Sequence, residues 1–559
     1  MPKRAWILGL AALLSLASGA PGQTRGAFTL AGVVVRAGTN QPLNHVLVTI
    51  AYPQRREWRL SYITDTDGRF VFQNLPAGKW DMIAEKNGYR LQIYQGDEGY
   101  STAVAVGPGL DTTHIVFPLS PPGILSGTVT DDQGDPVRQA LVLLFRNGVA
   151  LGKLTTQNAG QQQTDAAGEF SFGSLRPGTY YVAVSARPWY AKNFSGTFGI
   201  SRRFASTRQL SSEEVQQLQE AARREAEAAR QEAEAVPHDE RDVAYPVTYY
   251  GDGTDGASAE PVSVQEGEEA RIRITVRATP AWRLRIPDGV GHGVQIEVPG
   301  PGGVPINFPA QVTSDAKQIE VLGVPSGRYN LRLISKAGAS KIVDVTGDQS
   351  IDFSDVTPVV LTAHVTWEGS TARASNQVFM RLIGENNMNT AGGHITSDGS
   401  FNLDENNNLV PGRYRILLQN SNGFVIRSVQ AKGARYANGV LDIAGDGPVD
   451  LSITATSNLA KIDGIAMRNN APCPAAMILL LPADGNADAI RRDQSDSDGT
   501  FTLPEVLPGR YTLVGIDNGR DLAYQDPAVM AKYLPQGQSV EVPLKSQSPL
   551  TIAVQPRLP

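Results

Sequence analysis

Apolar and polar residues alternate along most of the chain in short runs, and one such run recurs with the same ending. In the copy that begins at Phe170, the alternating residues end at Leu175, an Arg-Pro-Gly turn comes next, and Tyr180 opens the next run. Alternation with a period of two is typical of a strand with one buried face, and proline followed by glycine is typical of a turn. The phrase therefore predicts two strands joined as a hairpin. Its five copies begin at Phe70, Phe170, Ile319, Phe401 and Phe501.

The surroundings of each copy predict a complete sandwich. An Asp/Gly turn such as Asp65–Gly68 precedes four of the copies, and further strands with Gly/Pro turns lie on either side. About seven short strands with turns every 8–12 residues are the pattern of an antiparallel β-sandwich of about 100 residues. We therefore predict a mostly β fold of tandem antiparallel β-sandwiches, of the immunoglobulin or transthyretin-like kind, with one inserted long α-helix. The predicted sandwiches comprise residues 27–119, 120–279, 280–356, 357–456 and 457–559.

Residues 211–236 break the β pattern and predict the helix. Ser211 to Glu214 form a capping box, Ala, Glu, Gln and Arg dominate the residues after it, and Pro237 ends the segment. The order of motifs from Tyr94 to Leu119 recurs behind this helix, so residues 206–237 are predicted to be an insertion in the second sandwich. The helix is either an arm for oligomerisation or partner docking, or a solvated helix that lies on its parent domain.

The first 22 residues have the order of a secretory signal peptide. Lys3 and Arg4 precede an apolar run from Ala5 to Ala17, and small residues come next. We therefore expect cleavage and export to the periplasm, the cell surface or the medium. An uncleaved anchor is the alternative, although its apolar run is short for spanning a bilayer. No later stretch is apolar enough to predict a transmembrane segment after cleavage.

Composition narrows the classes of function. The 559 residues include 56 Gly and 36 Pro, many of them at the recurring turns, but 1 Cys and 6 His. One cysteine cannot form an intramolecular disulfide or a Cys-based zinc site, and a net charge of −6 argues against a nucleic-acid partner. No zinc-protease, nucleophile-elbow or phosphate-loop motif occurs. We expect no enzymatic activity, no metal and no cofactor. A tight turn is favoured over calcium binding at the Asp/Gly turns.

Aromatic clusters are the better candidates for binding. Trp189 and Tyr190 come directly after Pro188 in a predicted loop. A second cluster consists of Trp58 and Tyr62, and a third consists of Tyr249 and Tyr250 with Tyr245. Flat rings stack on sugars or anchor protein contacts, whereas most aromatic residues of β proteins belong to the core, which is the alternative for each cluster. The predicted ligand-binding residues are Trp189, Tyr190, Trp58, Tyr62, Tyr249 and Tyr250.

Residues 28–119, 120–205 and 457–559 share an order of motifs: Gly-x-Val, x-Pro-x-x-x-Val, Thr-Asp-x-x-Gly-x-Phe and Leu-x-Pro-Gly-x-Tyr. In these motifs the chain resembles the carboxypeptidase regulatory-like family of exported bacterial proteins, transthyretin-like sandwiches in a carbohydrate-binding-like superfamily. The first unit departs from the last motif at Pro76-Ala-Gly78 and Trp80.

The resemblance implies a non-catalytic accessory or binding module, and its superfamily implies carbohydrate. We therefore expect extracytoplasmic binding, with polysaccharide as the leading ligand. A structural or adhesive spacer that binds envelope proteins is the first alternative, and an enzyme with an unrecognised site is the second. The sequence leaves the oligomeric state open.

Overall fold

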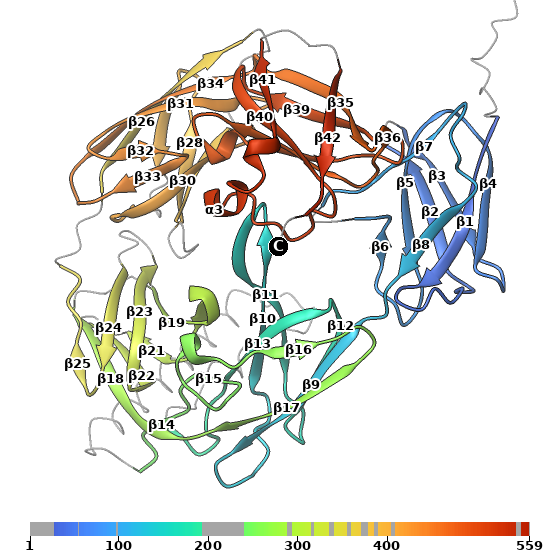
Figure 1. Ribbon diagram of the computed structural model, residues 1–559. Coiled ribbons are helices and arrows are strands. Elements are labelled where there is room, and N and C mark those ends of the chain that lie inside the picture. The colour runs from blue at the N-terminus through green and yellow to red at the C-terminus, as the bar shows by residue number, and fades with distance from the viewer. Residues whose placement is uncertain are drawn as a thin grey trace, which may run out of the picture. The chain divides into compact units, whose positions relative to one another are not determined.

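The computed structural model describes residues 27–53, 55–96, 99–192, 240–287, 293–314, 318–334, 340–354, 359–369, 378–384, 390–403, 409–543 and 549–557. The predicted signal peptide, residues 1–22, and the predicted helix, residues 211–236, lie outside the described residues. The described chain is mostly β, as predicted, and its longest helix is α3 (Pro527–Met530) with four residues. Figure 1 shows successive groups of strands coloured from blue to red along the chain.

Most of the first sandwich, without its strand at Gln92–Ile93, forms a unit of its own. Its contacts join residues up to Ala84 with Ala103–Pro118, whereas the segment Glu85–Thr102 belongs to a second unit with the rest of the chain. The strand orders of its two sheets are β4-β1-β8 and β3-β2-β5-β6, with β7 also paired to β5. The strands are β1 (Phe28–Arg36), β2 (Leu47–Tyr52), β3 (Arg55–Ile63), β4 (Arg69–Leu75), β5 (Gly78–Glu85), β6 (Gln92–Ile93), β7 (Val104–Val106) and β8 (Ile115–Leu119).

The second sandwich repeats this topology with residues from both sides of positions 193–239. Its sheets have the orders β12-β9-β17 and β11-β10-β13-β15, with β16 also paired to β13. The strands before the gap in the description are β9 (Gly123–Asp131), β10 (Leu141–Ala150), β11 (Lys153–Gln163), β12 (Glu169–Leu175) and β13 (Gly178–Ser185). Those after it are β15 (Thr248–Tyr249), β16 (Val262–Val264) and β17 (Glu269–Val276).

The third sandwich has two sheets, with the orders β14-β18-β22-β21 and β20-β19-β23-β24, and β25 also pairs with β18. Its strands are β14 (Val243–Ala244), β18 (Thr279–Pro287), β19 (Gly293–Pro299), β20 (Pro305–Asn307), β21 (Gln311–Ser314), β22 (Gln318–Pro325), β23 (Gly327–Ile334), β24 (Ser340–Val345) and β25 (Gln349–Ser350).

In the fourth group of strands the two halves are hydrogen-bonded into one path, β31-β34-β26-β29-β28-β27-β30-β33-β32. These strands are β26 (Leu361–Glu368), β27 (Phe379–Gly384), β28 (Thr390–Ile395), β29 (Ser400–Leu403), β30 (Gly412–Gln419), β31 (Val425–Lys432), β32 (Arg435–Ala437), β33 (Val440–Ile443) and β34 (Val449–Thr456).

The fifth group has the order β36-β35-β42-β40-β37-β38, with β39 on β35 and β41 on β40. Its strands are β35 (Ala460–Arg468), β36 (Ala471–Pro472), β37 (Met477–Pro482), β38 (Arg491–Gln494), β39 (Thr500–Val506), β40 (Gly509–Ile516), β41 (Gln538–Val542) and β42 (Leu550–Gln555).

The sheets are not purely antiparallel, which corrects the sequence prediction. The closing strand of each later repeat pairs in parallel with the opening strand: β17 with β9, β25 with β18, β34 with β26 and β42 with β35. Parallel neighbours cannot be joined by a tight turn and need a longer crossover connection. Here the chain passes through the opposite sheet before it returns, so the closing strand runs in the direction of the first.

The recurring phrase is also not a hairpin, so that prediction is wrong. β12 pairs with β9 in one sheet, and β13 pairs with β10 in the other. A residue with left-handed backbone comes just before the last apolar residue of the first strand, as at Ser174 (φ 58°), and such a residue produces a bulge that bends the strand. Gly178 (φ 149°) then begins the next strand. The phrase is therefore a corner through which the chain crosses between sheets.

The aromatic residue of the phrase closes this corner with a hydrogen bond. The Tyr180 hydroxyl donates to the carbonyl oxygen of Arg176, four residues earlier, at 2.7 Å. A tyrosine that bonds back to the backbone at a sandwich corner is a known stabilising device in immunoglobulin-like folds. Three other tyrosines donate the same bond: Tyr329 to Pro325 O, Tyr414 to Val410 O and Tyr511 to Leu507 O. In the first sandwich the corner residue is Trp80, whose Nε1–H donates to Pro76 O over a longer distance of 3.5 Å.

The other motif residues also serve the fold. Thr164 is buried, donates to the carbonyl of Val137 at 2.6 Å and accepts from the N–H of Ala140 at 2.9 Å. Thr64 and Ser495 do the same in the first and fifth sandwiches. A β-carbon at Gly127 would lie 2.4 Å from the carbonyl oxygen of Ile272 on β17, so only glycine lets β9 and β17 approach this closely.

The second and third sandwiches share one hydrophobic core. Leu144 and Val182 face the interior of the second sandwich, whereas the alternate residues Leu143, Phe145 and Ala183 belong to a cluster that continues into the third. The sheet of β10 and β13 is thus buried on both faces, which explains why the run from Leu141 is almost continuously apolar.

Candidate functional site

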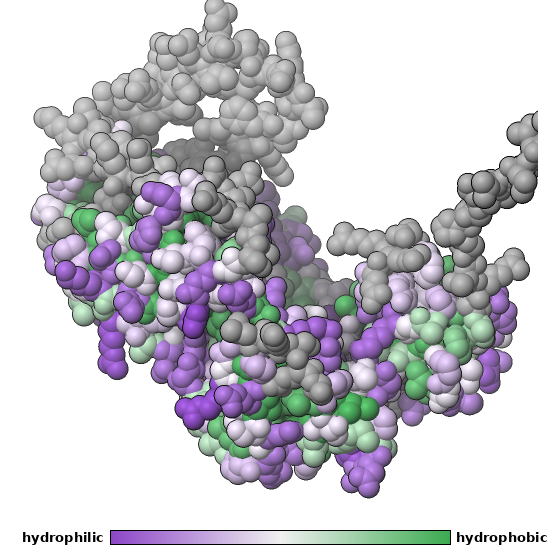
Figure 2. Space-filling view, turned by 90° about the horizontal axis from the view of Figure 1, so that it is seen from above, coloured by the Kyte–Doolittle hydropathy of each residue, from purple (hydrophilic) through white to green (hydrophobic). Residues whose placement is uncertain are grey.

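Trp189 and Tyr190 form the most exposed aromatic pair of the described chain. The Trp189 side chain is 79% exposed and Tyr190 is 40% exposed. The two ring centroids are 5.7 Å apart and the ring planes meet at 84°. Pro188 is buried, and its carbonyl accepts the N–H of Ala191 at 3.1 Å, so a tight turn presents the pair directly after β13. Figure 2 shows hydrophobic side chains on one face of the molecule in separate groups among hydrophilic ones.

An acidic turn and Tyr190 both lie near the buried Tyr245. Burial raises the pKa of Tyr245, and the negative charges of Asp131 and Asp132 raise it further, with Tyr190 also close enough to contribute. Asp131 Oδ1 accepts two backbone N–H groups of its own turn, including that of Gln133 at 3.0 Å. Asp131, Asp132 and Tyr190 thus lie around the same buried tyrosine.

Trp58 and Tyr62 lie on the edge strand β3 and are half-buried. The Trp58 ring is 5.7 Å from that of Tyr52, which in turn packs edge-on against the buried Trp80 at 5.2 Å. Tyr62 makes a similar contact with the core residue Phe72 at 6.1 Å. These rings are partly tied to the first core and offer less free surface than Trp189.

Tyr249 is not exposed, which corrects the interpretation of its cluster. It is 1% exposed, belongs to the core shared by the second and third sandwiches, and its hydroxyl donates to Pro299 O at 3.3 Å. Burial raises its pKa. Tyr250 packs partly buried against the core of the second sandwich, and Tyr245 is buried in it. The aromatic residues at these positions therefore pack in the core of the second sandwich and join it to the third.

The carboxylates of the Asp/Gly turns are engaged by their own backbone. Asp165 Oδ1 accepts the N–H groups of Ala167 at 2.8 Å and Glu169 at 2.9 Å. Asp65 accepts equivalent bonds from Asp67 and Arg69. Within the described residues, no group of three or more His, Cys, Asp or Glu side chains is arranged to hold a metal ion.

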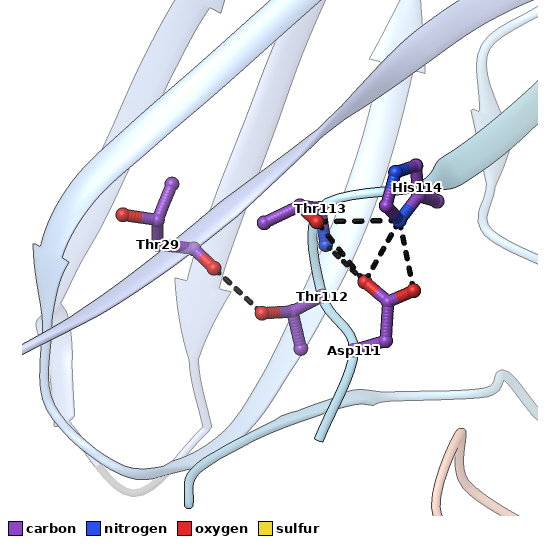
Figure 3. A network of polar contacts seen from close by, with 5 residues as sticks. All are labelled: Thr29, Asp111, Thr112, Thr113 and His114. Carbon is purple, nitrogen blue, oxygen red and sulfur yellow. Dashed lines mark hydrogen bonds and ion pairs between the residues drawn. The ribbon is translucent and has the colours of Figure 1, made fainter. Parts of the chain in front are cut away.

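A polar network that the sequence did not single out lies just before β8 (Figure 3). Asp111 accepts from the N–H of Thr113 at 3.0 Å, and Nδ1 of His114 lies 2.8 Å from its second oxygen. The backbone bond from Thr113, together with the weaker contact with His114, lowers the pKa of Asp111. Thr112 anchors the turn by donating to Thr29 O at 2.6 Å. The Thr113 hydroxyl also donates to Asp111, so the carboxylate organises this exposed turn.

Two further features bear on chemistry and location. The lone cysteine, Cys473, is buried, and burial raises the pKa of its thiol, which keeps it protonated and unreactive near neutral pH. In the part of the chain that the structure describes, no helix has the length and apolar character needed to cross a membrane.

Residues 29–119 and 124–197 match the family model of the carboxypeptidase regulatory-like domain. This match confirms the predicted resemblance for residues 28–119 and 120–205, and the resemblance of residues 457–559 stays a prediction. The match covers the first two sandwiches, whose strands repeat the same topology. In these two regulatory-like sandwiches the family motif residues make the corner, turn and close-approach contacts described above. A comparison with curated proteins finds no match.

Similarity to solved structures is distant. The minor pilin GBS52 of Streptococcus agalactiae is 12% identical over 45% of this chain and 96% of its own, with a TM-score of 0.20. The Bacillus anthracis TIE protein is 11% identical over 96% of this chain and 69% of its own, with a TM-score of 0.15. The major pilin subunit of Bacillus cereus is 9% identical over 77% and 99%, with a TM-score of 0.13. At these TM-scores the similarities carry no argument about function.

Proposed function

We propose that the protein is an exported, non-catalytic binding protein whose second sandwich presents Trp189 and Tyr190 to a carbohydrate. The exposure of Trp189 carries the proposal. A buried aromatic side chain removes about 150–250 Å² from water, so leaving 79% of Trp189 exposed forgoes roughly 3–5 kcal/mol at about 25 cal/mol per Å². Tryptophan and tyrosine side chains are enriched among the residues that contribute most to binding.

The surroundings of the pair support a sugar as the ligand. An aromatic face packs against the C–H groups of a pyranose ring, and carboxylates accept hydrogen bonds from its hydroxyl groups. Asp131 and Asp132, which like Tyr190 lie near Tyr245, supply such acceptors. Export is supported by residues 1–22, which have the order of a signal peptide.

A spacer that binds envelope proteins is the second candidate, and one observation favours it. The hydrophobic core shared by the second and third sandwiches joins two domains into a stiff pair, as suits a protein that holds other parts at a distance. Under this alternative Trp189 anchors a protein contact.

A glycan array with the full chain tests the proposal. We expect the wild type to bind a defined set of glycans, and Trp189→Ala or Tyr190→Ala to weaken that binding about tenfold or more. Leu154→Ala is the matched control, because Leu154 is 67% exposed on the same sandwich without an aromatic ring. If the wild type binds no glycan, the carbohydrate assignment is wrong and the spacer remains. Equal losses in the control would show that the aromatic pair is not the site.

A further inference from the structure

A cavity of about 490 Å³ lies at the end of the second sandwich where the chain crosses from β12 to β13. Arg146 of β10 and Arg176 of the corner contribute to its lining, together with Tyr180. Arg146 is directly opposite Tyr180 in the pairing of β10 with β13, and the Tyr180 hydroxyl donates to the carbonyl of Arg176. Both arginine residues therefore lie next to the same tyrosine, and Arg176 is exposed.

A third arginine comes from the segment Glu85–Thr102, which belongs to the same contact unit. Burial lowers the pKa of Arg90, and the positive charges of Arg176 and Arg146 lower it further. Among the described residues, no carboxylate forms an ion pair within 4.0 Å of Arg90, Arg146 or Arg176. The lining includes one acid, Asp521. The cavity thus has an excess of positive charge that the chain itself does not neutralise.

One donor at this place has no hydrogen-bond partner. The Nε atom of Arg146 is buried, and no acceptor of the described residues bonds to it. It lies close to the corner, because a β-carbon built on Gly178 would be 3.3 Å from it. A buried charged donor without a partner costs free energy. An anionic acceptor in the cavity would remove that cost.

The fold does not need arginine at either position, as the other copies of the corner show. The position of Arg176, four residues before the corner aromatic, is apolar in every other copy: Pro76, Pro325, Val410 and Leu507. The position of Arg146, opposite the corner tyrosine, is Gly384 in the fourth sandwich and Pro482 in the fifth. The two arginines therefore distinguish the second sandwich from its relatives in the same chain.

We propose that this cavity binds an oxyanion, a sulfate or phosphate group, through the guanidinium groups of Arg146 and Arg176, with the positive charge of Arg90 close by. Arginine is suited to such groups because its planar fork offers parallel N–H donors to two oxygens. Gln157 and Asn158 of β11 add side-chain amides to the lining, and Gln157 lies opposite Arg146 in the pairing of β10 with β11.

The oxyanion site is separate from the aromatic pair. The cavity adjoins the first residues of β13, whereas Trp189 lies beyond its last residue. Eight residues at about 3.3 Å each place the two sites roughly 25 Å apart along the strand. The oxyanion proposal therefore does not depend on carbohydrate binding at Trp189.

Isothermal titration calorimetry with the full chain at low ionic strength tests the site, with inorganic sulfate and inorganic phosphate as probes. We expect Arg146→Gln and Arg176→Leu each to weaken binding about tenfold or more, because each removes a charge-assisted contact. Leucine stands at the position of Arg176 in the fifth sandwich, so this variant is expected to fold, and hydrogen exchange at the β12–β13 corner checks it. Arg138→Gln is the matched control, since exposed Arg138 precedes β10 at the opposite end of the sandwich.

The two arginine variants and their control give distinct outcomes. Unchanged binding in the control, with losses in both cavity variants, supports the site. The proposal is overturned if the wild type binds neither anion at millimolar concentration, or if Arg138→Gln weakens binding as much as Arg146→Gln. A sulfated disaccharide and its unsulfated parent then identify the source of the oxyanion. Tighter binding of the sulfated sugar than of inorganic sulfate indicates a sulfate ester on a glycan, and equal binding indicates the free anion.

Discussion

The corner tyrosine provides a direct test of how the recurring phrase stabilises the sandwich. In the fifth repeat the Tyr511 hydroxyl donates to Leu507 O at 2.8 Å, and the Tyr511 side chain is only 4% exposed. Tyr511→Phe keeps the ring in the core and removes the hydroxyl alone. A hydrogen bond of this kind contributes about 0.5–1.5 kcal/mol net. Leu507 is half-buried, so water can replace part of the lost bond, and we expect a loss of about 1 kcal/mol.

Hydrogen–deuterium exchange of the full chain measures this loss locally. A decrease of about 1 kcal/mol in the opening free energy speeds exchange roughly fivefold, and we expect this for amides of β39 and β40. The corner of the second sandwich, which keeps Tyr180, is the internal control and should not change. If exchange in β39 and β40 is the same in Tyr511→Phe as in the wild type, the hydroxyl does not stabilise the corner.

Four further predictions concern other parts of the chain. Gly464→Ala should destabilise the fifth sandwich by several kcal/mol or prevent its folding, because a β-carbon there would lie 2.3 Å from Phe501 Cζ and 2.7 Å from Leu550 O; the yield of soluble protein and thermal unfolding measure this. Phe145→Ala should cost about 3–5 kcal/mol and speed exchange in both the second and third sandwiches, whereas Phe172→Ala, in the core of the second alone, should affect only that sandwich. Hydrogen bonds from the Thr396 hydroxyl, and after it from Ser400, lower the pKa of Asp398 to about 2. The contribution of Asp398 to stability is therefore present above its unfolded pKa near 3.9 and disappears as the pH falls towards about 2. An NMR titration of the Asp398 carboxyl checks this pKa, and Asp398→Asn should remove the acid dependence. If residues 1–22 are a cleaved signal peptide, intact-mass analysis after expression of the full chain should show a protein that lacks them, and a retained N-terminus would refute cleavage.

The sequence predicted the class of fold because the strand and turn signals are local. Alternation around Phe170 and Phe172 defines a strand from its own residues, and both side chains lie in the core as expected. Strand pairing depends on distant partners. The bulge at Ser174 and the bond from Tyr180 to Arg176 turn the chain out of one sheet and into the other, so the phrase resembles a hairpin in sequence but crosses the sandwich.

Aromatic exposure was harder to predict for the same reason. Trp189-Tyr190 and Tyr249-Tyr250 are both aromatic pairs beside short polar stretches, and nothing local separates them. Tyr249 is buried because the outer face of its sheet is covered by the third sandwich, including Pro299, whose carbonyl lies 50 positions further along the chain. Trp189 lies beyond the end of β13, where no such cover reaches it in the described chain.

Comparison among the copies in this chain separates residues that make the fold from those available for binding. The corner tyrosine makes the same backbone bond in four copies, and Thr64, Thr164 and Ser495 make the same pair of bonds before their turns. Their chemistry is therefore already used within each sandwich. The second sandwich also carries residues that do not recur in the other copies, namely Arg146, Arg176 and Trp189. The fold uses neither the Nε donor of Arg146 nor the exposed ring face of Trp189. Function is thus best sought where this sandwich departs from the common pattern, since the shared motif accounts for the architecture that all five copies need.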